Sequence, residues 1–122
     1  MKEDKYLWTH HAREKMKYYR LTEARVKRII RHPTRLEEGV LDEAVACMQP
    51  AHGNGRGSPS LTGRPAKNYS EIWVMYLLAK PSAKGQKSKI KIITAWRYPG
   101  KSPSREPVPA NILKEARKLI YG

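Results

Sequence analysis

Several features are scarce in this 122-residue sequence. It has a single cysteine, Cys47, so no disulfide can form within the chain, and a reducing compartment is expected. No apolar run reaches the roughly 18 residues of a membrane-spanning helix, so no membrane contact is expected. The first residues, MKEDKYLW, carry charges and lack the apolar stretch of a secretory signal. Together these absences predict a cytoplasmic protein.

Acidic residues are also scarce. The chain has 25 Lys and Arg against 11 Asp and Glu, which gives a net charge of +14. Residues 1–50 hold eleven cations and eight anions, whereas residues 51–122 hold fourteen cations and three anions. A field of this sign attracts polyanions. Because the excess is concentrated in one half, it favours nucleic-acid contact over a surface that is merely soluble.

Hydrophobic spacing predicts a single α+β domain over residues 1–122. Thr9 and Thr22 have the features of N-caps for two helices joined by a tight turn, and Pro33 ends the second helix. Residues 34–40 and 41–48 are expected to form two short strands, or a strand and an irregular return, and residues 69–80 a central strand. The next strand begins near residue 89, and a C-terminal helix follows with Asn111 as its N-cap.

This order predicts two N-terminal helices packed on a 3-4-stranded antiparallel sheet with a C-terminal helix, and with all helices on one face. Residues 50–68 contain four glycines and three prolines and almost nothing to bury, so we expect a flexible loop there. Cysteine and histidine show no recurring spacing, which predicts neither a metal nor a cofactor.

The segment KIKIITAWRYPGK, from Lys89 to Lys101, is an apolar strand with cations at both ends. Strict alternation places Lys91 and Arg97 on the same side of this strand. If that side is concave, the two cations bracket a groove suited to a phosphate backbone. Alternatively, the lysines protect an edge strand from aggregation, an explanation that fits Arg97 less well.

The first helix offers a second group of side chains. His11, Lys15 and Tyr18 follow i, i+4, i+7 spacing and share one stripe of the helix. Imidazole, ammonium and phenol are groups that RNA cleavage can use, with His11 as acid or base and Lys15 as the cation. The alternative is a solvated helix face, which is the commoner meaning of such a trio taken alone.

The stretch HAREKMKYYRLTEARVKRIIRHP resembles the opening of a bacterial family of small domains. The shared features are a His-Ala start, a Met four residues after the Ala, an Arg-Leu/Ile-Thr junction and a Val-containing helix ended by Pro. KIKIITAW is similar to the late strand of the same family. That family is similar to the RelE/BrnT toxins of toxin–antitoxin systems. The resemblance implies N-terminal helices on an antiparallel sheet and a basic groove that cuts mRNA, often on the ribosome.

These observations together predict a RelE/BrnT-like toxin that is a metal-independent mRNA endoribonuclease, with RNA and an acidic antitoxin as partners. It would be a monomer, or a dimer with the antitoxin. The expected catalytic residues are His11, Lys15, Arg97 and Tyr98. The expected nucleic-acid contacts are Lys89, Lys91, Arg13, Arg56, Arg64 and Lys101. Two alternatives stay open: a non-catalytic RNA/DNA-binding module of the same fold, and a partner-binding domain whose charge serves only solubility.

Overall fold

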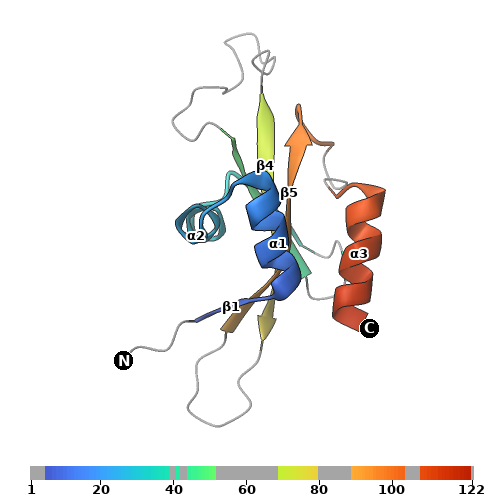
Figure 1. Ribbon diagram of the computed structural model, residues 1–122. Coiled ribbons are helices and arrows are strands. Elements are labelled where there is room, and N and C mark those ends of the chain that lie inside the picture. The colour runs from blue at the N-terminus through green and yellow to red at the C-terminus, as the bar shows by residue number, and fades with distance from the viewer. Residues whose placement is uncertain are drawn as a thin grey trace.

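The computed structural model describes residues 5–38, 41, 44–51, 69–79, 89–103 and 108–121 (Figure 1). The elements in chain order are β1 (Tyr6–Trp8), α1 (His10–Tyr19), α2 (Glu23–Arg31), β2 (Arg35–Glu38), β3 (Ala44–Pro50), β4 (Ser70–Ala79), β5 (Lys89–Pro99) and α3 (Ala110–Tyr121). The predicted α+β class is confirmed. The sheet has five strands in the order β1-β5-β4-β3-β2.

The expected sheet was wrong in two respects, because it has five strands rather than three or four, and it is mixed rather than wholly antiparallel. β1 pairs in parallel with β5, and the other neighbouring strands pair antiparallel. Two boundaries also differ from expectation. Pro50 is the last residue of β3, so the segment expected as a loop starts later, and residues 52–68 lie outside the described residues. α3 begins at Ala110, which places Asn111 inside the helix rather than at its N-cap.

The two predicted N-caps are confirmed. The hydroxyl oxygen of Thr9 accepts a hydrogen bond from the N–H of Ala12 at 3.1 Å, and that of Thr22 accepts from Arg25 at the same distance. Such side chains satisfy backbone donors that have no partner within the helix. The Thr9 hydroxyl also donates to the carbonyl of Ile92 at 2.7 Å, so the start of α1 is fixed to β5.

The turn between α1 and α2 is made by Arg20, whose backbone is left-handed at φ 58° and ψ 47°. The N–H of Leu21 bonds the carbonyl of Met16 at 2.7 Å, and the N–H of Arg20 reaches Lys17 at 3.2 Å. This is the pattern of a Schellman C-cap, in which glycine is the usual left-handed residue. A side chain other than glycine therefore occupies a conformation that L-residues rarely adopt.

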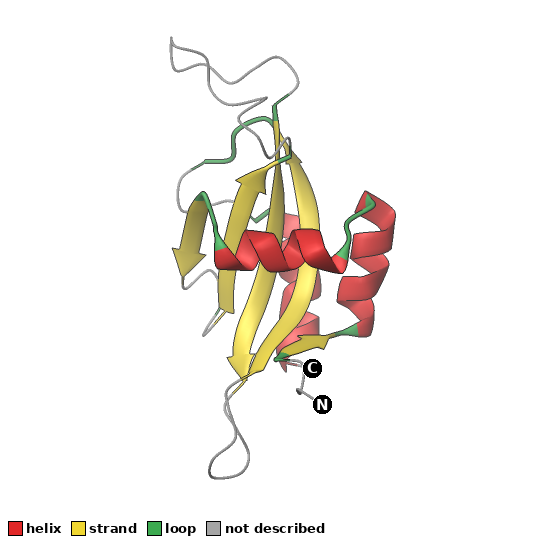
Figure 2. Cartoon of the chain, turned by 90° about the vertical axis from the view of Figure 1, so that its left-hand side faces the viewer, coloured by secondary structure: helices red, strands yellow, loops and turns green. Residues whose placement is uncertain are grey.

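Both faces of the sheet carry a buried apolar cluster. Along β4, Ile72 and Val74 belong to the cluster under α1 and α2, whereas Trp73 and Met75 belong to the one under α3. The helices contribute Ala12, Met16, Val26 and Ile29 to the first cluster, and Ile112 and Ala116 to the second. Figure 2 shows the sheet between α2 and α3. The expectation that all helices cover one face was wrong, because a sheet that is apolar on both faces needs cover on both.

A bulge in β5 interrupts its alternation. Met75 of β4 pairs with Thr94, but the next residue, Tyr76, pairs with Ile92, so Ile93 is an additional residue in β5. A bulge of this kind shifts the side chains that follow it relative to those that precede it. Because Ile93 and Thr94 are both buried, the bulge lies within the core.

The bulge places Lys91 and Arg97 on opposite faces of the sheet. Arg97 pairs with Ile72, on the α1/α2 face, whereas Lys91 pairs with Leu77, which packs against the cluster under α3. The predicted groove bracketed by these two cations was therefore wrong.

Within the described ranges, no helix is both long enough and apolar enough to cross a membrane.

Candidate nucleic-acid interface

A hollow of about 460 Å³ lies where the end of α1 and the start of α2 meet the sheet. It is lined by Tyr18, Tyr19, Arg20, Leu21, Arg25, Ala51, Ile72 and Arg97, and we call it the arginine hollow. No carboxylate is among these described lining residues. Three guanidinium groups beside two phenols can bind phosphate and contact a base. The arrangement suits an anionic ligand with an aromatic part.

Different elements bring the three arginines to the hollow. Arg20 arrives through the left-handed cap of α1, and Arg97 through its pairing with Ile72 on β5. Arg25, in the first turn of α2, donates to the carbonyl of Pro50 at 2.7 Å. Burial and nearby Arg28 lower the pKa of Arg25, but a guanidinium stays charged in proteins. The hollow therefore combines one anchored cation with two others at its margin.

Tyr18 provides an exposed ring at this hollow. It is 77% exposed, and its ring meets that of Tyr19 edge-on, with centroids 4.8 Å apart and an interplanar angle of 88°. Unpaired bases stack on exposed aromatic rings, whereas bases in a duplex have their faces covered. The spacing in the sequence predicted that Tyr18 shares a stripe of α1 with His11 and Lys15. The structure places Tyr18 beside Arg97 in the arginine hollow instead.

His11 and Lys15 lie together at a different place, the junction of α1 and α3. The same carboxylate oxygen of Glu115 is 3.5 Å from His11 Nε2 and 3.7 Å from Lys15 Nζ. His11 Nε2 and Glu115 Oε2 are both buried and lack a hydrogen-bond partner in the described part of the chain. Glu115 was not singled out in the sequence, although it is the one acid among the described residues of α3.

The four predicted catalytic residues are thus not brought into one group. Arg97 lines the arginine hollow, whereas Tyr98 packs against the cluster under α3. His11 and Lys15 are not among the residues that line the hollow. The pleat of β5 separates Arg97 from Tyr98, since adjacent residues of a strand face opposite sides.

The predicted nucleic-acid contacts are also dispersed. Arg13 is engaged, because its guanidinium is 3.0 Å from Glu23 and lies over the Trp8 ring. Lys89 and Lys91 lie at the opposite end of β5 from Arg97, and Lys101 is exposed just after that strand. Two of the predicted contacts, Arg56 and Arg64, lie outside the described residues.

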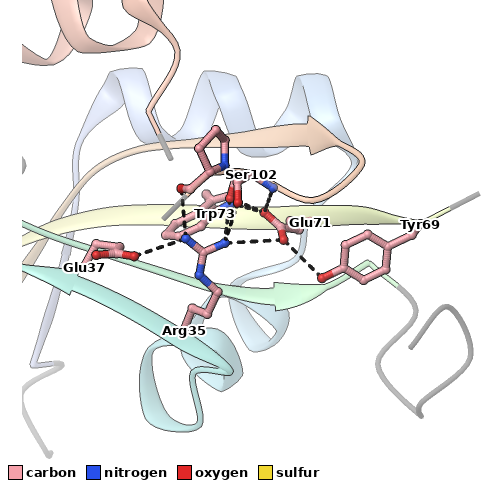
Figure 3. A network of polar contacts seen from close by, with 7 residues as sticks. Arg35, Glu37, Tyr69, Glu71, Trp73 and Ser102 are labelled. Carbon is pink, nitrogen blue, oxygen red and sulfur yellow. Dashed lines mark hydrogen bonds and ion pairs between the residues drawn. The ribbon is translucent and has the colours of Figure 1, made fainter. Parts of the chain in front are cut away.

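Beneath the other face of the sheet lies a buried polar network (Figure 3). The carboxylate of Glu71 accepts hydrogen bonds from Trp73 Nε1 at 2.9 Å, the Ser102 hydroxyl at 2.6 Å and the Tyr69 hydroxyl at 3.1 Å. Arg35 lies 3.7 Å from it. Burial and the Glu71 charge raise the pKa of Tyr69 to about 12, so this phenol stays protonated and donates.

We interpret the Glu71 network as structural. Its groups satisfy one another, since Arg35 also donates to the carbonyl of Ser102 at 3.1 Å and to Glu37 at 3.1 Å. A fully satisfied buried network fixes the elements that contribute to it. Here it joins β2, β4 and the segment after β5, and it leaves no group free to act on a ligand.

In the ranges that the structure describes, no three His, Cys, Asp or Glu side chains gather as a metal site. Comparison of the chain with protein-family models, curated proteins and solved structures found no match. The resemblance to RelE/BrnT toxins accordingly stays a prediction from the sequence.

Proposed function

We propose that this protein binds single-stranded RNA, with the sugar-phosphate backbone in the arginine hollow. The observation that carries the proposal is the convergence of Arg20, Arg25 and Arg97 on one hollow whose described lining has no acid. Arginine binds phosphate oxygens through two parallel hydrogen bonds, and the net charge of +14 attracts a polyanion at long range. The exposed ring of Tyr18 favours a single strand over a duplex.

We propose further that the bound RNA is cleaved without a metal, as in the toxins that the sequence resembles. The ribose 2′-oxygen attacks the adjacent phosphorus and loses its proton to a base. The bond from phosphorus to the 5′-oxygen breaks, and this oxygen takes up a proton, which leaves a cyclic phosphate and a 5′-hydroxyl. Arg97 stabilises the charge that grows on the phosphate oxygens.

The proton transfers in this proposal belong to Tyr18 and Tyr19 rather than to His11. Among the described lining residues, only these two phenols can exchange a proton, because the arginines stay charged. His11 contacts Glu115 at the α1–α3 junction instead. In the cell, an acidic antitoxin would cover the same hollow by charge complementarity.

One observation favours a second candidate function, a non-catalytic RNA- or DNA-binding module. Neither a histidine nor a carboxylate is present in the described lining of the arginine hollow, and these are the commonest groups for acid–base catalysis. A protein of this kind would bind RNA with steep salt dependence and leave it intact.

One experiment separates these functions. Purified wild-type protein and an Arg97→Ala variant are incubated with mRNA, with and without ribosomes, and bound and cleaved RNA are measured in parallel. We expect the wild type to bind and cleave, and the variant to lose most of both. RNA that is bound but stays intact under both conditions would exclude cleavage and support the non-catalytic binding module. If neither RNA nor heparin retains the protein at low salt, the result would support the remaining alternative, a partner-binding domain whose charge serves only solubility.

A further inference from the structure

A second cationic surface lies on α2 beside the arginine hollow. A hollow of about 430 Å³ is lined by Ala24, Lys27, Arg28, Arg31 and His32, and we call these residues the α2 belt. Their spacing of three and four residues places them along one face of the helix. The opposite face of α2 carries Val26 and Ile29, which pack against the sheet. Arg28 and Arg31 therefore point away from the core, whereas Lys27 lies over the ring of Tyr6 at 5.2 Å.

Arg28 connects the belt to the arginine hollow. It lies one turn after Arg25, and the two charges are near enough for Arg28 to lower the pKa of Arg25. α2 spans Glu23–Arg31, so at about 1.5 Å per residue it is roughly 13 Å long. Arg25 of the hollow and Arg28 and Arg31 of the belt thus follow one another along a single short helix.

The charge of the belt has little internal compensation. The acid of α2, Glu23, is already bound to Arg13 at 3.0 Å. Over the described ranges, neither an ion pair nor a side-chain hydrogen bond engages Arg28 or Arg31, and both are exposed. Like charges on adjacent turns of a helix repel. A bound polyanion would relieve this repulsion, and it would do so with the same chemistry as in the arginine hollow.

We infer that an RNA strand held in the arginine hollow continues across α2, so that its neighbouring phosphates contact Arg28 and Arg31. The inference rests on the proposed RNA binding, and it defines how far the RNA-binding site extends beyond the arginine hollow. A strand that fills only the hollow gains nothing from the belt, whereas a longer strand meets both. Affinity should therefore depend on the belt for long strands alone.

The test compares labelled oligouridylates of 4 and 12 nucleotides by fluorescence anisotropy. We expect the double variant Arg28→Ala/Arg31→Ala to weaken binding of the 12-mer about tenfold and to bind the 4-mer within about twofold of wild type. Because this variant no longer neutralises two of the phosphates, the slope of log Kd against log salt should fall by about 1.4 for the 12-mer. Arg97→Ala should weaken the binding of both the 4-mer and the 12-mer.

The matched control is Arg117→Ala/Lys118→Ala, which removes the same charge from exposed positions of α3. It should leave both affinities within about twofold, since α3 covers the other face of the sheet. If the α2 double variant behaves like this control on the 12-mer, the inference is overturned while RNA binding stands. If the wild type binds neither strand, the proposed function itself fails. Thermal unfolding of each variant shows that the fold is kept.

Discussion

Arg97 and Ile72 are directly paired across β5 and β4, and both side chains line the arginine hollow. Ile72 is 1% exposed and forms a fixed floor, while Arg97 is exposed at the margin. β4 is the central strand of the sheet and pairs with β5 along its whole length, so the cation is carried by a backbone that β4 holds in place. A binding group on such rigid elements needs little ordering when a ligand arrives.

The pairing predicts different roles for the two cations of β5. Arg97→Ala should weaken RNA binding about five- to tenfold with little change in stability, because the side chain is exposed. Lys91→Ala removes the same charge from the same strand but from the opposite face, so it should change affinity less than about twofold. Anisotropy titrations at one salt concentration measure both. Equal losses for the two variants would mean that overall charge, rather than the hollow, binds the RNA.

Replacing Arg20 by glycine should change stability and RNA binding in opposite directions. Its left-handed backbone costs an L-residue up to about 1 kcal/mol that glycine avoids. Arg20→Gly should therefore raise the free energy of unfolding by up to about 1 kcal/mol, while RNA binding weakens because a guanidinium is lost. Arg20→Ala is the control, since it weakens binding without the gain in stability. Urea unfolding that shows equal stability for the two variants would contradict the argument.

Tyr18 separates binding from catalysis. Tyr18→Ala should weaken RNA binding by about 1–3 kcal/mol, the usual contribution of a stacked base. Tyr18→Phe keeps the ring and should bind within about twofold of wild type. If the Tyr18 hydroxyl transfers a proton, cleavage by the Phe variant falls at least tenfold under single-turnover conditions, whereas cleavage at the wild-type rate would assign that proton to another group.

The Glu71 network should matter for stability alone. Glu71→Ala leaves Arg35 and the donors of Trp73 and Ser102 without their acceptor, and we expect a loss of about 3 kcal/mol in the free energy of unfolding. Glu37 also contacts Arg35 but is less buried, so Glu37→Ala should cost less than about 1 kcal/mol. Urea titrations followed by tryptophan fluorescence provide the comparison. Similar losses at both positions would show that the network is not the structural centre inferred here.

Cys47 should be unreactive in the folded protein. Burial raises the pKa of its thiol to about 12 from an ordinary value of 9.0, and the thiolate is the reactive form. We expect no labelling by a disulfide reagent at pH 8 until urea unfolds the chain. The unfolded chain releases this proton more readily, so the stability that the thiol contributes is present below pH 9 and is lost as pH rises toward 12. Rapid native labelling would contradict this burial.

Elements with local signals could be predicted from the sequence. Thr9 and Thr22 identify the starts of α1 and α2 because capping depends on nearby residues alone. The apolar run around Trp73 likewise identified β4 as central. β1 was missed, since a strand of three residues is too short to show a period and pairs with a segment far along the chain.

The site was harder to predict because its geometry depends on pairing. Arg97 and Tyr18 were named, but nothing in the sequence shows that Ile93 is an additional residue in β5. Isoleucine fits equally well at a regular or a bulged position, so hydrophobicity carries no sign of the shift. Arg25 was not distinguished from the other helix cations, since its selection depends on contact with Pro50.

The pairing of β1 with β5 also has a consequence for synthesis of the protein. Tyr6 lies beside Ile90, and the hydroxyl of Thr9 bonds the carbonyl of Ile92, 83 residues later. During translation β1 has no strand to pair with until β5 has emerged. Its docking therefore comes late, and contacts of such sequence separation slow folding. β1 is therefore made long before the strand that fixes it in the sheet.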